Sequence, residues 1–114
     1  MVSGTLTEDE ADRVFHALAD ATRRDILRRT ATEEQSISAL ARHYAMSLPA
    51  VQKHVGVLER AALVQKQRRG REQILVGRPE TIRTAAGLLD AVEALWVGRA
   101  TRIAELLGEE GTTR

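Results

Sequence analysis

The sequence predicts one mainly helical domain that carries a small β-hairpin. Apolar residues recur every three or four positions through most of the 114-residue chain, as they do on the buried face of a helix. Two short segments containing Val, Ile and Leu flank Gly70, which is typical of a hairpin. The chain contains no cysteine, so disulfides, thiolate metal sites and cysteine nucleophiles are excluded. A chain of this size can bury enough surface to fold without such links.

The first two helices are predicted over residues 8–19 and 21–31. Thr7 and Glu10 have the spacing of a capping box, and Asp20 is suited to cap the second helix. The inner face of the first helix consists of Ala11, Val14, Phe15 and Leu18. The second helix is expected to point its arginines outward, where they are solvated, paired with aspartates or close to a phosphate. These are Arg23, Arg24, Arg28 and Arg29.

Two further helices are predicted over residues 36–43 and 47–61, after a polar loop at 31–35. A break of three residues, 44–46, separates them, and each begins with a serine suited to cap it. Pro49 falls in a first turn, where its missing N–H has no partner to lose. The buried face of the second of these helices is predicted to contain Val51, Val55 and Leu58. Its opposite face presents Leu48, Gln52, Lys53 and Gly56.

A hairpin is predicted over residues 63–77 and a last helix over residues 79–107, with Pro79 in its first turn. The hairpin has a basic tip formed by Arg68, Arg69, Gly70 and Arg71. The apolar stripe of the last helix consists of Ile82, Ala85, Leu89, Val92, Trp96, Ile103 and Leu106. A domain of this size has little core left to cover that stripe, so we expect part of it to form a subunit interface.

Two short helices joined by a three-residue turn and followed by a basic hairpin make up a winged helix-turn-helix. In that fold the second helix of the pair places its N-terminal end in the major groove of DNA, and the hairpin follows the phosphate backbone or enters the minor groove. Residues 42–83 contain nine basic and three acidic residues, a net charge of +6, whereas the rest of the chain has a net charge of −5. This asymmetry is typical of a DNA-facing segment on an acidic body.

Two runs of sequence resemble the ArsR family of bacterial transcriptional repressors. They are VFHALADATRRDILRR at residues 14–29 and ISALARHYAMSLPAVQKHVGVLERAALV at residues 37–64. The strongest local match is SLPAVQKH at residues 47–54, and the resemblance extends over residues 11–107. Ala45 fills a turn position that is often glycine in this family, where a left-handed backbone would be mildly strained.

Length, composition and the absence of a linker predict a single domain over residues 1–114, and the resemblance implies that it forms a homodimer through its first and last helices. It also implies binding of double-stranded DNA at an inverted-repeat operator and repression of transcription. The residues expected to contact DNA are Ser47, Leu48, Ala50, Gln52, Lys53, His54, Arg42, Arg68, Arg69 and Arg71. The residues expected at the dimer interface are Phe15, Leu18, Leu89, Val92, Trp96 and Ile103.

Neither known metal-sensing route of this family is expected to operate. Residues 36–41, SISALA, stand where many members carry a cysteine motif, and the last helix contains no histidine. His54 is expected at the edge of the core, hydrogen-bonded or touching a phosphate. No metal, cofactor or catalytic residue is expected, since no motif of nucleophilic, metal-assisted or phosphate-loop catalysis is present.

We expect a cytoplasmic protein without a membrane partner, because the start MVSGTLTEDE is acidic and no apolar run approaches the ~20 residues of a membrane span. Two alternatives stay open. One is a sensor of the same fold that releases DNA when a small molecule or an oxygen-ligated metal binds between its first and last helices. The other is a winged-helix module that contacts proteins. The sequence identifies no inducer and no operator.

Overall fold

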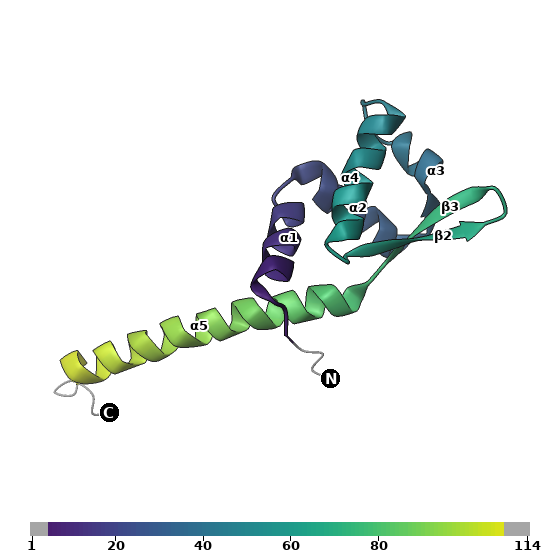
Figure 1. Ribbon diagram of the computed structural model, residues 1–114. Helices are drawn as coiled ribbons and strands as arrows, with labels where there is room; N and C mark the ends of the chain where they lie inside the picture. The colour runs from purple at the N-terminus through teal and green to yellow at the C-terminus, as the bar shows by residue number, and fades with distance from the viewer. Residues whose placement is uncertain (1–4, 109–114) are drawn as a thin grey trace.

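The computed structural model describes residues 5–108, in which a helical body carries a small antiparallel sheet that projects to one side (Figure 1). The helices are α1 (Glu8–Leu18), α2 (Ala21–Thr32), α3 (Ile37–Ala41), α4 (Leu48–Arg60) and α5 (Pro79–Gly108). The strands are β1 (Gln35–Ser36), β2 (Val64–Arg69) and β3 (Glu72–Gly77). The five helices and the hairpin occur in the predicted order, with bounds within two residues of those expected, whereas β1 was not predicted.

Short polar side chains begin the first four helices, as predicted. Thr7 and Glu10 form the full capping box, in which each side chain accepts a hydrogen bond from the backbone N–H of the other. The other capping oxygens belong to Asp20, Ser36 and Ser47. The predicted starts of α3 and α4, at residues 36 and 47, were therefore one residue too early, because these serines are the N-caps. The predicted end of α3 at residue 43 was also too late, because residues 42 and 43 form a turn.

Strand β1 corrects the prediction that the polar loop extends to residue 35 and that the hairpin stands alone. Gln35 and Ser36 pair antiparallel with Leu75 and Ile74, so the strand order in the sheet is β1-β3-β2. A strand of two residues is too short to show the alternation of polar and apolar side chains by which strands are recognised, so the sequence pattern could not predict β1. Strand β1 joins the start of α3 to the hairpin and thereby fixes where the hairpin projects.

The core lies between α4 and the elements that surround it. The predicted inner face of α4 is confirmed, since Val51, Val55 and Leu58 each have none of their surface exposed. The largest fully buried side chains from the other elements are Ile26, Leu40, Leu63 and Leu75. Because α4 packs against α1, α2, α3 and β2, its position is determined from several sides.

Helix α5 begins on the body and then projects away from it (Figure 1). Its 30 residues span about 45 Å at the α-helical rise, and the molecule is 69 Å along its longest axis. Only Thr81 and Ala85 of this helix are buried. The Thr81 hydroxyl donates a hydrogen bond to the Ala62 carbonyl oxygen, 2.6 Å away, and so ties the start of α5 to the end of α4.

A left-handed backbone occurs after α4 and not at Ala45, where the sequence suggested possible strain. Within residues 5–108, Ala62 is the only residue other than glycine with a positive φ, which is 60°. The N–H of Leu63 bonds to the Leu58 carbonyl and that of Ala62 to the Glu59 carbonyl. This is the Schellman arrangement that ends many helices, and its left-handed position usually holds glycine.

Ala62→Gly should stabilise the fold by about 1 kcal/mol, because glycine adopts a left-handed backbone without the steric cost of a Cβ atom. The measurement is the free energy of unfolding from urea titration. Ala61→Gly is the matched control, because the preceding residue has a φ of −85° and gains nothing from glycine. That control should destabilise the protein, and an equal effect of both variants would contradict the assignment of strain to Ala62.

Candidate nucleic-acid interface

Helix α4 presents an exposed face at the end of the body opposite to α5 (Figure 1). Leu48 is 41% exposed, and Gln52 and Lys53 are exposed as well. The Ser47 cap and Pro49 leave the first turn of the helix at the surface, with its backbone N–H groups and the positive end of the helix dipole. This face can therefore approach an anionic surface without displacing any core residue.

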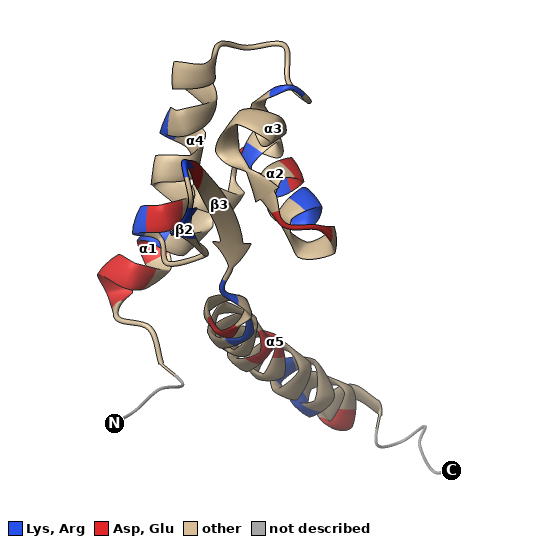
Figure 2. Cartoon of the chain, turned by 90° about the vertical axis from the view of Figure 1, so that its right-hand side faces the viewer, with Lys and Arg blue, Asp and Glu red and all other residues tan. Residues whose placement is uncertain are grey.

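The hairpin turns at Gly70, which has a φ of 64°, and it carries an exposed basic tip. A hollow of about 400 Å³ lies between α3, α4 and the hairpin, and both Gln52 of α4 and Arg71 of the tip line it. We call Leu48, Gln52 and Lys53 of α4, together with the hairpin tip, the α4–hairpin surface. Figure 2 looks along the hairpin, and the acidic first turn of α1 lies well away from the end of the body where α4 begins.

The three arginines of the tip differ in their partners. Arg69 forms a two-pronged ion pair with Glu34, with Nη1–Oε1 and Nη2–Oε2 distances of 2.6 and 3.3 Å. The hydrogen bond and charge of Arg69 lower the pKa of Glu34 below its ordinary value. Arg68 donates to the Gly70 carbonyl, whereas Arg71 makes no ion pair within residues 5–108. Arg71 is therefore available to an anion at once, and Arg69 has to leave Glu34 first.

Arg23 corrects the prediction that every arginine of α2 points outward. It is 9% exposed, and its guanidinium donates to the carbonyl oxygens of Ala17 and His16 at the end of α1. Its Nη1 atom also lies 3.2 Å from Nδ1 of His54 on α4. The helical spacing predicted that Arg23 lies on the outer face of α2. The end of α1 packs over that position and buries the side chain, which no local pattern indicates. Arg23 thereby links the α1–α2 junction to α4.

His54 lies at the edge of the core and is hydrogen-bonded, as predicted. A guanidinium can only donate, so Nδ1 of His54 accepts and the ring proton of the neutral form is on Nε2. Asp20 also lies nearby, with its Oδ1 atom 3.9 Å from the same nitrogen. Arg23 and Asp20 both lie at the start of α2, so the hydrogen bond from Arg23 orients the His54 ring from that helix.

The turn between α3 and α4 is fastened to α2 through Tyr44. The Tyr44 hydroxyl donates to Asp25 Oδ2 at 2.6 Å, and Arg29 donates to the same oxygen at 2.8 Å. Burial and the bond to Asp25 raise the pKa of Tyr44 to about 12. The bonds from Tyr44 and Arg29 lower the pKa of Asp25. Arg28 also pairs with Asp25 at 3.5 Å, which confirms the predicted pairing for these two arginines.

The remaining predicted site residues lie in different surroundings. Arg42 is exposed at the C-cap of α3, Ala50 is half-buried, and the Ser47 side-chain oxygen is used as the cap of α4. Of the predicted interface residues, Phe15 and Leu18 are half-buried against the core. The other four are exposed along α5, and these are Leu89, Val92, Trp96 and Ile103.

Sequence reasoning missed three residues that shape the α4–hairpin surface, namely Arg23, Glu34 and Tyr44. Their partners are 31, 35 and 19 positions away in the chain, so no local pattern identifies them. Among residues 5–108, no group of three His, Cys, Asp or Glu side chains is placed to hold a metal ion. No helix in that range has the length and apolarity required to cross a membrane.

Comparisons with known proteins agree with this geometry. A family model described as a helix-turn-helix domain matches residues 18–67. The HTH-type transcriptional regulator Rv2034 of Mycobacterium tuberculosis is 35% identical over 100 residues, which is 88% of this chain and 91% of that protein. The structure of an ArsR-like transcriptional regulator from Rhodococcus sp. RHA1 is 32% identical with a TM-score of 0.78, over 86% of this chain and 92% of that chain.

A third relative is a homodimeric winged helix-turn-helix DNA-binding domain from Mycobacterium bovis, described as a possible ArsR-family regulator. It is 27% identical with a TM-score of 0.62, and the match covers 75% of this chain and 80% of that chain. The winged helix-turn-helix fold predicted from the sequence is therefore confirmed.

The raised pKa of Tyr44 can be measured directly, because the chain contains one tyrosine. The absorbance of tyrosinate should titrate with a midpoint of about 12 in the folded protein and about 10 in denaturant. The folded state is stabilised below pH ~10, and that stabilisation is lost as the pH rises toward the folded pKa, because only the unfolded chain has released its proton.

Asp25→Asn is the control for this titration. It should lower the folded midpoint, because the bond to the carboxylate is lost, while burial keeps the pKa above its ordinary value. A folded midpoint at about 10 in the unmodified protein would contradict the buried bond between Tyr44 and Asp25.

Proposed function

The chain belongs to the ArsR family of helix-turn-helix transcriptional regulators, and from that premise we propose that it is a homodimeric repressor of an inverted-repeat operator. Members of this family bind DNA and are not enzymes. Because the chain has no cysteine, it does not sense metals through thiolates. The observation that carries the proposal is the α4–hairpin surface, where Gln52 of α4 and Arg71 of the hairpin line one hollow.

Helix α4 is proposed to read base edges in the major groove with the residues of its exposed first turns. Gln52 has an amide that can both donate to and accept from an adenine edge, and Lys53 can donate to guanine. Leu48 is an exposed apolar side chain that suits contact with a thymine methyl group. Ser47 keeps a hydroxyl proton to donate while its oxygen caps the helix, and Ala50 lets the backbone approach closely.

The phosphate backbone is proposed to be contacted on both sides of α4. Arg42 lies before α4, and Arg68 and Arg71 lie on the hairpin. His54 carries its proton on the nitrogen that does not face Arg23, so that N–H is the one with which it would meet a phosphate. Arg69 joins this set only when its ion pair with Glu34 opens.

A homodimer is proposed because one protomer offers one α4, and an inverted repeat needs two related by a twofold axis. Helices α1 and α5 are the proposed interface, with Phe15 and Leu18 on the first. The M. bovis relative is described as homodimeric, which supports this assignment. Repression then follows if the dimer occupies DNA that RNA polymerase needs to bind.

Fluorescence anisotropy on a duplex from the region upstream of its own gene, compared with a scrambled duplex across a salt series, tests the proposal. Binding that prefers the native duplex at ~150 mM salt is the expected result. Equal and weak binding to both duplexes, lost as salt rises, would contradict the assignment of a sequence-specific regulator and leave only a basic surface.

Arg68→Ala with Arg71→Ala should weaken binding to every duplex and lower the slope of log affinity against log salt by about 0.9 for each phosphate contact removed. Arg83→Ala with Arg102→Ala is a control of equal charge change, because both residues are exposed on α5, away from the α4–hairpin surface. Anisotropy across the salt series gives both slopes. An unchanged slope in the double variant would remove the hairpin from the interface.

Glu34→Gln should strengthen binding to any duplex several-fold, because Glu34 both holds Arg69 and repels phosphate. Glu33→Gln is the matched control, since it removes the same charge from the adjacent exposed residue, which has no ion pair with Arg69. The same anisotropy assay compares the two. Equal gains would assign the effect to overall charge, and weaker binding of Glu34→Gln would show that Glu34 positions Arg69 for DNA.

A further inference from the structure

A hollow of about 520 Å³ lies where α2, the base of the hairpin and the start of α5 meet. Leu27 of α2, Leu63 between α4 and β2, and Ile82 of α5 contribute apolar surface to it. Leu63 is 1% exposed and Ile82 is 42% exposed, so the hollow extends from the edge of the core to the surface. Its volume is in the range of small-molecule sites, which are mostly apolar clefts of roughly 300 to 1,000 Å³.

The side chains that line the hollow favour a ligand whose body is apolar. Within residues 5–108, the lining side chains include no acid, and Thr30 is the only neutral polar one among them. The Thr30 hydroxyl already donates a hydrogen bond to the Ile26 carbonyl oxygen, 2.7 Å away. A ligand rich in hydroxyl groups would find no neutral side chain free to pair with most of them, which is costly for a group that leaves water. Sugars and nucleosides are therefore poor candidates.

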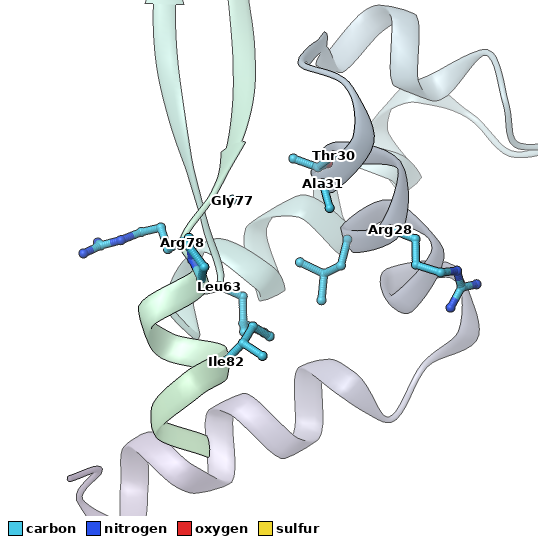
Figure 3. A pocket seen from close by; sticks show the side chains of 9 residues that line it. Arg28, Thr30, Ala31, Leu63, Gly77, Arg78 and Ile82 are labelled. Atoms are coloured by element: carbon cyan, nitrogen blue, oxygen red, sulfur yellow. The ribbon is translucent and has the colours of Figure 1, made fainter. Parts of the chain in front are cut away.

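Two arginines lie at opposite margins of the hollow. Figure 3 shows the side chains of Leu63 and Ile82 inside the hollow and those of Arg28 and Arg78 extending outward on either side. The carbon stem of an arginine can cover apolar surface while its guanidinium group stays in water. Arg78 is held by Glu80, with 2.9 Å between Nε and Oε2. The hollow therefore combines an apolar wall with cationic margins.

Arg28 is the arginine that can turn toward an occupant of the hollow. Its side chain is 70% exposed, and its Nη2 atom lies 3.5 Å from Asp25 Oδ1, a long ion pair. Asp25 has two closer partners, since Arg29 donates to Oδ2 at 2.8 Å and Tyr44 at 2.6 Å. Asp25 keeps both of these bonds when Arg28 leaves it. One carboxylate thus faces two guanidinium groups, and the margin of the hollow at Arg28 has a positive charge in excess.

We propose that this hollow binds a small organic carboxylate, whose apolar body contacts Leu27, Leu63 and Ile82 and whose head group pairs with Arg28. A guanidinium group suits a carboxylate because it can donate two parallel N–H bonds to the two oxygens. The site is distinct from a cleft between the first and last helices, since none of the described residues that line it belongs to α1. The inference rests neither on the proposed operator nor on the proposed homodimer.

Isothermal titration calorimetry with decanoate as the probe tests the head group. Decanoate should bind, and decylamine, which has a chain of the same length and the opposite charge, should bind about tenfold more weakly or less. Arg28→Gln should raise the dissociation constant of decanoate about tenfold, because a charge-assisted hydrogen bond is lost. Arg24→Gln is the matched control, since Arg24 is exposed one turn earlier on α2 and does not line the hollow.

A second pair of variants tests the hollow itself. Ala31→Phe adds a ring to the lining of the hollow and should weaken decanoate binding tenfold or more, because the ring takes the place of the ligand. Thr32→Phe is the matched control, since it adds the same ring at the next residue, which is exposed and does not line the hollow. Both positions are exposed, so neither variant disturbs the core, and circular dichroism checks that each is folded.

Four outcomes would overturn the proposal, and each has a different meaning. Absence of decanoate binding would remove the ligand, and equal binding of decylamine would remove the carboxylate. Binding that Ala31→Phe leaves unchanged would place decanoate elsewhere, such as on the exposed apolar side chains of α5. A weaker dimer of Ala31→Phe in sedimentation equilibrium, without decanoate binding by the unmodified chain, would show that a second copy occupies the hollow. Anisotropy on DNA judges the proposed function separately.

Discussion

The burial of one face of α4 is the constraint on which the rest of the structure depends. Val51, Val55 and Leu58 are completely enclosed by the other elements of the body. A helix with a 3.6-residue repeat cannot bury that face without turning Gln52 and Lys53 to the outside. The hydrophobic effect that folds the domain is therefore also what exposes the side chains proposed to contact DNA, so loss of core packing and loss of DNA binding are expected to occur together.

Polar contacts then set the position of α4 more finely than apolar packing can. Arg23 connects the end of α1 to His54, and Tyr44 fastens the turn before α4 to Asp25 on α2. Thr81 ties the end of α4 to the beginning of α5. These hydrogen bonds have directions, whereas apolar contacts have none. They therefore connect the proposed DNA-facing helix to the proposed dimer helix through a short and rigid path.

The proposed surfaces for DNA and for a second copy of the chain lie at different ends of this small domain. The basic hairpin and the start of α4 lie at one end of the body, and α5 leaves from the other (Figure 1). If α1 and α5 form the proposed dimer interface, the separation between the two α4 helices is set by how α5 is attached to the body. The half-site spacing of the operator would then be a geometric property of α5.

The sequence by itself determined the helices, the hairpin, the caps and the two faces of α4, because these depend on local spacing and on side chains a few positions apart. It also identified the exposed stripe of α5, since a heptad pattern is visible without coordinates. Only the tertiary structure decided that Arg23 is buried, that Glu34 holds Arg69, that Gln35 and Ser36 form a strand and that the left-handed residue is Ala62. The first three are contacts between residues distant in the chain, and the last depends on how α4 must end for Leu63 to reach the core.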